Sequence, residues 1–173
     1  MSKTEENLRI AFSGESRARN KYAYFAEVAR QEGYHYIAKI FEEISENEKY
    51  HAIEELKLLY GETTTLQNLK AAVQGETYES EEMYPKFAVE ADQEGYREAC
   101  ILFSQIAKIE KQHRERFEAL LKMVENGTVY AREKPVRWKC SKCGYTIEGT
   151  EPPKRCPYCK VSREYYEPAN LDV

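Results

Sequence analysis

The 173-residue sequence lacks any apolar run near the ~20 residues that a membrane span requires. Its first residues, MSKTEENLRI, lack the apolar core of a signal peptide, so we expect a cytoplasmic protein. Basic residues are not in excess, since 26 Lys and Arg stand against 30 Asp and Glu, and no basic stripe with interleaved aromatics occurs. These absences argue against membrane insertion and against nucleic-acid binding.

Cysteine is scarce over most of the chain, because four of the five cysteines fall between residues 140 and 159. In a reducing compartment such crowding favours a metal site over disulfides. The four are spaced as two C-x-x-C pairs and predict a tetrahedral site of Cys140, Cys143, Cys156 and Cys159. The spacing alone favours zinc, whereas attachment to a redox-active di-metal site would favour a one-electron iron centre.

An internal repeat organises the first 125 residues. FAEVARQEGY (25–34) matches FAVEADQEGY (87–96) at an offset of 62, whereas FSGES (12–16) matches VQGET (73–77) at an offset of 61. One residue is therefore inserted in the second copy, and an insertion within a helix predicts a π-bulge. Each copy predicts two antiparallel helices joined by a turn that contains a glycine.

Residues 61–75 join the two copies. If extended, they would reach ~50 Å, which exceeds the ~38 Å length of a helix of about 25 residues. Two hairpins joined by one long crossover describe a ferritin-like four-helix bundle, so we predict a mainly α fold. The expected domains are the bundle at 1–124, a linker at 125–135 and a small four-cysteine metal domain at 136–173.

Charged residues continue the apolar face of a predicted helix. The helical stripe at residues 37–44 continues at Glu48 and His51, and the second copy repeats this E-x-x-H pair at Glu110 and His113. Residues three apart share a helical face, and a buried charge is costly unless it has a partner. One such pair alone would carry little weight in so charged a chain, but two pairs in register indicate metal ligands.

The complete ligand set of a di-iron carboxylate protein needs one further Glu from each remaining helix. The expected bundle ligands are Glu15, Glu48, His51, Glu76, Glu110 and His113. Glu79 is an addition without an acidic counterpart in the first copy. Carboxylates with a few imidazoles suit iron or manganese. Tyr22 shares the face of Glu15, although ordinary packing is an alternative in a chain with 14 tyrosines.

The sequence resembles the rubrerythrins in the segments AFSGESRARNKY, ENEKYHA, GETYESEEMYP, QEGY, IEKQH and WKCSKCGY…CPYC. This resemblance covers nearly the whole chain and implies a ferritin-like di-iron bundle with a C-terminal rubredoxin-like domain. It implies a non-haem peroxidase that reduces hydrogen peroxide to water in oxidative-stress defence. Electrons would pass from a donor protein or reductase through the four-cysteine iron. A homodimer, head-to-tail or domain-swapped, is also implied.

The resemblance also implies a role for each bundle ligand. Glu48 and Glu110 would bridge the two irons, and Glu15 and Glu76 would each be terminal on one iron. His113 would bind the iron held by Glu76.

Redox-dependent ligation is implied on the other side of the centre. Glu79 or His51 would bind the iron held by Glu15, depending on the redox state. Glu79, His51 and Tyr22 are therefore the expected catalytic residues. Tyr22 and Tyr84 match tyrosines close to the family's site.

Two other functions remain open at this point. A ferritin-like site also oxidises Fe(II) for storage, and the fold alone does not separate this from peroxidase activity. The third hypothesis is a non-enzymatic carrier of electrons or metal, with structural zinc in the tail. The four-cysteine tail favours a catalyst that is repeatedly reduced.

One position departs from the family pattern. The second C-x-x-C pair, here called the second knuckle, reads CPYCK where CPxCG is common. We expect Lys160 at a positive φ, at a cost of ~1 kcal/mol and with a shift of the reduction potential.

Overall fold

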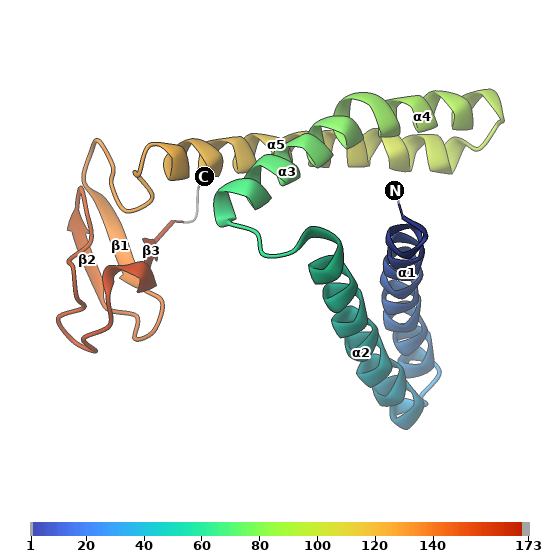
Figure 1. The fold of residues 1–173 in the computed structure, drawn as a ribbon, viewed down its shortest axis with the longest axis horizontal. Helices are drawn as coiled ribbons and strands as arrows, with labels where there is room; N and C mark the ends of the chain where they lie inside the picture. The colour runs from blue at the N-terminus through green and yellow to red at the C-terminus, as the bar shows by residue number, and fades with distance from the viewer. Residues whose placement is uncertain (1, 171–173) are drawn as a thin grey trace. The chain divides into compact units, whose positions relative to one another are not determined.

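The computed structural model describes residues 2–170 (Figure 1). Residue 1, which begins the first expected domain, and residues 171–173, which end the last one, lie outside the described part. The described chain is mainly helical, which confirms the predicted fold class. None of its described helices is both long and apolar enough to cross a membrane. The chain divides into two compact units between Thr63 and Thr64.

The first unit is a helical hairpin. Helices α1 (Lys3–Gln31) and α2 (His35–Tyr60) lie side by side (Figure 1). The turn contains Gly33 at φ 86°, as predicted, and the Tyr34 amide donates to the Ala29 carbonyl at 2.8 Å. This is the hydrogen-bond pattern that ends a helix at a left-handed glycine.

Small side chains let α1 and α2 approach closely. Ala26 and Ala38 are each 1% exposed and lie at the contact between the helices. The Ser45 hydroxyl also donates to the carbonyl of Arg19 on α1, at 2.8 Å. Because the contact is made by small residues, most of the bulky apolar side chains of this hairpin lie elsewhere on its surface.

The second unit begins with another hairpin. One arm consists of α3 (Thr65–Tyr78), the π-helical segment η1 (Glu79–Met83) and α4 (Tyr84–Gln93), and it packs along α5 (Arg97–Glu125) (Figure 1). Gly95 in the turn has φ 83° and matches Gly33 of the first hairpin.

The segment η1 confirms the π-bulge that the one-residue insertion predicted. The Tyr84 amide donates to the carbonyl of Glu79, five residues back, and the Ser80 hydroxyl donates to the Glu76 carbonyl at 2.6 Å. Pro85 follows directly and has no amide hydrogen to donate. The wide turn therefore lies where the chain could not continue a regular α-helix without losing a hydrogen bond.

The expected extended crossover at residues 61–75 is wrong. Only Gly61–Thr64 lies between α2 and α3. Thr64 accepts a hydrogen bond from the Gln67 amide at 3.2 Å, and the Gln67 side chain accepts one from the Thr64 amide at 2.8 Å. This capping box begins α3 at Thr65. The sequence TTLQ contains the capping-box residues, which the prediction of an extended crossover overlooked.

The C-terminal part of the second unit is a small three-stranded antiparallel sheet in the order β2-β1-β3. Trp138 at its centre is fully buried and donates from Nε1 to the Gly149 carbonyl at 3.0 Å. The elements are β1 (Val136–Cys140), β2 (Thr146–Gly149), the 3-10 helix η2 (Arg163–Tyr165) and β3 (Tyr166–Pro168).

Candidate metal centres

The first unit gathers three of the expected ligands. Glu15 on α1 and Glu48 and His51 on α2 place ligand atoms within 4.8 Å of one another. His51 Nδ1 lies 2.8 Å from a carboxylate oxygen of Glu48 and 3.9 Å from one of Glu15. The Glu48 side chain is 17% exposed, whereas that of His51 is 61% exposed.

The second unit repeats this arrangement with the other three. Glu76 on α3 and Glu110 and His113 on α5 again lie within 4.8 Å of one another. His113 Nδ1 lies 2.6 Å from Glu110 and 3.7 Å from Glu76. The sequence repeat is therefore also a repeat of ligand geometry, with each histidine set against two carboxylates.

Each group has more negative charge than its histidine can compensate. Burial raises the pKa of Glu15, and the hydrogen bond and charge of Glu48 raise it further, while His51 lowers it. The pKa of Glu76 is likewise raised by burial and then by Glu110. One buried oxygen of Glu76 has no hydrogen-bond partner among the described residues. Clustered carboxylates with an unsatisfied oxygen fit cation binding, so both groups suit a di-iron centre.

Glu79 is the first residue of the π-helical segment η1 and is half-buried. It does not belong to the group of Glu76, Glu110 and His113. Its charge still reaches the site, because it raises the pKa of Glu76 and, after burial, that of Tyr84. The structure thus places Glu79 beside the second group rather than within it.

Each hairpin carries an aromatic cluster on the same two arms as its ligand group. In the first, the ring of Tyr22 lies 6.2 Å from that of Phe25 and 6.2 Å from that of Phe41. The second hairpin has the matching cluster of Tyr84, Phe87 and Phe103, with Tyr84 6.1 Å from Phe103. Each tyrosine ring packs against phenylalanines.

Glu55 is a site residue that the sequence prediction omitted. It lies four residues after His51, and its charge raises the pKa of Glu15. One of its carboxylate oxygens is buried without a hydrogen-bond partner among the described residues. The helical stripe through Glu48 and His51 extends to this position and was the signal that could have identified it.

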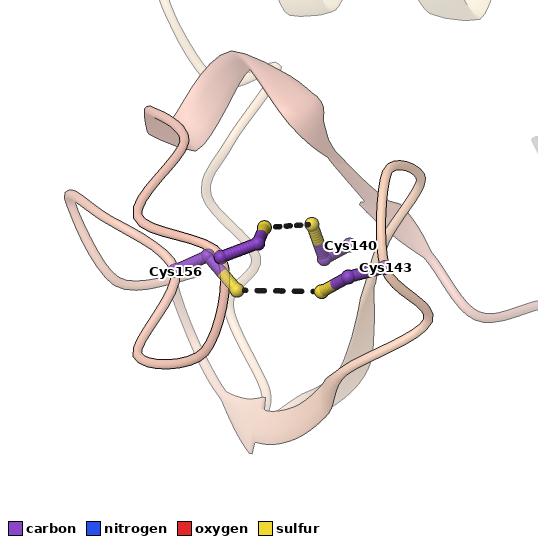
Figure 2. Close-up of side chains that lie close together, drawn as sticks. Cys140, Cys143 and Cys156 are labelled. Carbon is purple, nitrogen blue, oxygen red and sulfur yellow. Dashed lines mark hydrogen bonds between the residues drawn. The ribbon is translucent and has the colours of Figure 1, made fainter.

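The third site is the predicted four-cysteine cluster (Figure 2). The sulfurs of Cys140 and Cys159 lie 3.7 Å apart, as do those of Cys143 and Cys156. Figure 2 shows that the sulfurs of the two knuckles point toward one another. All four ligand atoms lie within 4.8 Å of one another, which suits a single tetrahedral metal ion.

The thiols of this cluster have strongly divergent acidities. Burial opposes ionisation of Cys156, but the backbone amides of Cys159 and Tyr158 and the nearby Tyr166 hydroxyl lower its pKa to about 6. For Cys143 the Tyr145 amide favours the thiolate, but burial and the neighbouring thiols raise the pKa to about 12. A bound cation would remove this mutual repulsion and hold all four sulfurs as thiolates.

Lys160 has the positive φ that the sequence predicted, at 64°. Lys160→Gly should therefore stabilise the metal-loaded protein by ~1 kcal/mol, because glycine adopts this conformation without strain. Chemical denaturation of the two proteins measures the difference. Lys142→Gly is the control, since Lys142 lies in the first knuckle outside the residues with positive φ. Equal stability changes in the two variants would contradict the assignment of strain to Lys160.

Tyr166 gives a second prediction. Its side chain is 4% exposed, and its buried hydroxyl lies close enough to Cys156 to lower the pKa of that thiol, so we expect it to donate a hydrogen bond to the metal-bound sulfur. Hydrogen bonds to ligand sulfurs raise reduction potentials. Tyr166→Phe should lower the reduction potential of the iron-loaded tail by tens of millivolts. This shift corresponds to the loss of one hydrogen bond of ~1 kcal/mol. Redox titration tests this, with the 76%-exposed Tyr158 changed to Phe as control. An unchanged potential in Tyr166→Phe would exclude the bond.

The two carboxylate–histidine groups on helical hairpins and the four-thiol tail define an iron-dependent oxidoreductase of the ferritin-like class with a rubredoxin-like domain. The sequence matches the family model described as rubrerythrin over residues 6–121. It matches the model of the rubrerythrin rubredoxin-like domain over residues 138–167. The chain belongs to the rubrerythrin family.

Relatives support this assignment over almost the full length. The rubrerythrin of Porphyromonas gingivalis is 44% identical, with 96% of this chain and 90% of the relative covered. The rubrerythrin of Nitratidesulfovibrio vulgaris is 38% identical, with 96% and 94% covered. A solved structure of fully reduced, all-ferrous nigerythrin is 30% identical and covers 97% of this chain and 87% of that one, with a TM-score of 0.37. The family assignment depends on the sequence matches.

Proposed function

We propose that this protein is a peroxidase that reduces hydrogen peroxide to water with electrons relayed through iron in the four-cysteine tail. One observation carries the proposal. A single chain contains two matching groups of two carboxylates and a histidine, together with a cluster of four thiols. The first two groups suit a di-iron centre that reacts with an oxidant, and the third suits a one-electron donor to that centre.

The two groups support the ligand roles that the family resemblance implies. Glu48 and Glu110, the least exposed carboxylates of their groups, would bridge the two irons. Glu15 and Glu76 would be terminal ligands, and His113 would complete the side of Glu76. When bound, two ferrous ions supply both electrons to the peroxide bond together and act as Lewis acids.

The protein must also deliver two protons for each peroxide that becomes two waters. Glu79 is half-buried beside Tyr84, whose pKa is raised by burial and by the Glu79 charge, so this tyrosine keeps its proton at neutral pH. We propose that Glu79 accepts and returns protons, and that Tyr22 and Tyr84 orient peroxide with their hydroxyls.

The tail would restore the reduced state one electron at a time. Its four sulfurs would hold one ion, which we assign as iron, although zinc fits the same ligands. The upstream donor would be an electron-donor protein or reductase. Because all five cysteines are free thiols, we also propose a reducing, cytoplasmic setting for the protein.

The second candidate is a ferroxidase or iron-handling protein, favoured by the acidic ligand groups alone. Anaerobic mixing of the fully reduced protein with either peroxide or oxygen separates the two. If the protein is a peroxidase, the reduced protein should be oxidised faster by peroxide than by oxygen, and it should turn over steadily with a reduced rubredoxin-type donor. Faster reaction with oxygen and accumulation of ferric mineral would instead establish iron handling.

We further propose that the protein is a homodimer with a bundle domain at 1–124, a linker at 125–135 and a tail domain at 136–173. The coil that follows α5 separates the tail from the helices, since β1 begins only at Val136. A head-to-tail partner would bring the tail of one chain to the di-iron centre of the other.

A further inference from the structure

The first hairpin contains a carboxylate that the ligand group on its helices leaves unexplained. Glu55 on α2 is half-buried, and one of its carboxylate oxygens is buried without a hydrogen-bond partner among the described residues. Such an oxygen costs free energy, because it has lost its contacts with water and has gained no donor in exchange. A catalytic role or a bound ion is a common reason for keeping a buried polar atom of this kind.

The position of Glu55 on α2 places it beside the first ligand group. Glu48, His51 and Glu55 follow one another at spacings of three and four residues, so they lie along one face of the helix. His51 Nδ1 already faces the carboxylates of Glu48 and Glu15. Beyond burial and the effect of Glu48, the charge of Glu55 raises the pKa of Glu15 on α1. Glu55 therefore acts across the hairpin on the ligand group.

The second hairpin shows where a residue at this position lies. Phe117 on α5 is the counterpart of Glu55, at the offset of 62 that also relates the two ligand histidines. Phe117 lines a cavity of about 310 Å³ together with Glu76 and His113. The residue four places after the histidine thus borders the same cavity as two of the ligands.

The same comparison shows that the hairpin fold does not require a carboxylate at this position. Phe117 is half-buried and apolar, and the hairpin of α3 to α5 forms with it in place. An apolar side chain at position 55 would avoid the cost of the buried oxygen and the repulsion from Glu15 and Glu48. The negative charge of Glu55 therefore calls for a cause outside the packing of the helices.

We propose that Glu55 binds, as a further carboxylate ligand, the same divalent cation as Glu48 and His51 in the first hairpin. Glu55 lies outside the set of ligand atoms within 4.8 Å of one another, so its side chain changes rotamer to reach the ion. The cation then supplies the partner that the buried oxygen lacks. The first group would have three carboxylates and one histidine, the same number that Glu79 gives to the second group. The inference rests on the proposed di-iron centre and adds a ligand to it.

Manganese binding to the full chain tests the proposal. Mn²⁺ suits sites made of carboxylates and imidazole and does not favour thiols, so the tail contributes little. Glu55→Gln removes the charge and keeps the shape of the side chain. One of the two Mn²⁺ ions of the bundle should then bind roughly 10-fold more weakly or worse. The electron paramagnetic resonance signal of the bound ion should also change, because a ligand is lost. Glu55→Asp keeps the carboxylate and should recover part of the affinity.

Glu54→Gln is the matched control. Glu54 is the neighbouring residue and carries the same charge, but its side chain is 68% exposed and forms an ion pair with Lys57. This variant should bind both Mn²⁺ ions as the wild type does. An equal loss of affinity in the two variants, or an unchanged affinity in Glu55→Gln, would overturn the proposal. Weaker binding with an unaltered signal from the bound ion would assign the effect to charge alone and would also overturn direct ligation.

Thermal unfolding separates ligation from a role in packing. After removal of the metals with a chelator, Glu55→Gln should unfold a few degrees above the wild type, because repulsion from Glu15 and Glu48 is relieved. With Mn²⁺ in excess the order should reverse, because the wild type binds the ion more tightly. A lower unfolding temperature of the variant in both conditions would show a role in packing and overturn the proposal.

The wild-type protein distinguishes a failure of this inference from a failure of the proposed centre. A wild type that binds fewer than two Mn²⁺ ions in the bundle would overturn the di-iron centre and the role of Glu55 with it. Normal binding by the wild type and by Glu55→Gln would overturn the role of Glu55 alone. None of these measurements uses peroxide, so their outcome is independent of the proposed peroxidase activity.

Discussion

Glu79→Ala is expected to lose peroxide reactivity by ~100-fold or more while retaining two metal ions in the bundle centre. Glu79 lies outside the gathered group of Glu76, Glu110 and His113, so its removal leaves those ligands in place. A diferric centre carries two more positive charges than a diferrous one and should attract this extra carboxylate more strongly. His51, neutral as a ligand, suits the reduced state. Loss of Glu79 should therefore reduce peroxide turnover more than it reduces metal binding. The rate of oxidation by oxygen should rise relative to the rate with peroxide.

Rapid mixing of the reduced variant with peroxide measures the effect, and elemental analysis checks the metals. Glu82→Ala is a matched control, because Glu82 lies on the same π-helical segment but is exposed. Crystals of the oxidised and reduced protein give an independent test. Ligation by His51 in both states, with Glu79 never at ligand distance, would refute the redox switch.

Cys143→Ser is expected to remove one metal ion per chain and to abolish peroxide turnover that depends on an external donor. A structural metal site of this kind contributes on the order of 10 kcal/mol to folding, so the tail should lose its ordered sheet as well. The bundle ligands are unaffected, and a single oxidation of the chemically reduced protein by peroxide should therefore remain. Donor-linked turnover and single-turnover oxidation, measured side by side, separate the two effects.

Cys100→Ser provides the matched control. Cys100 is the fifth free cysteine, lies on α5 and is half-buried outside the cluster. Its replacement should leave both metal content and donor-linked turnover unchanged. Donor-linked turnover at the wild-type rate in Cys143→Ser would refute electron supply through the tail. A wild-type tail that holds only zinc after anaerobic loading with iron would also refute it.

The sequence by itself determined the features that depend on local spacing. The repeat of E-x-x-H predicted His51 beside Glu48 and His113 beside Glu110, because residues three apart on a helix always share a face. The two C-x-x-C pairs predicted the thiol cluster for a different reason, since each pair brings two thiols from one turn to the same metal ion. The change of offset between the copies predicted the π-bulge at η1, since one extra residue must be accommodated in one helical turn.

Tertiary structure decided the features that depend on contacts between segments. The buried oxygen of Glu55 and the buried hydroxyl of Tyr166 became visible only when neighbouring segments enclosed them. The start of α3 at Thr65, in contrast, is set by the local capping box of Thr64 and Gln67, a sequence signal that the prediction of a long crossover overlooked. That single difference shortens the connection to four residues. Burial of the Glu55 and Tyr166 polar atoms depends on contacts between segments far apart in the sequence, which the spacing of residues along one helix does not specify.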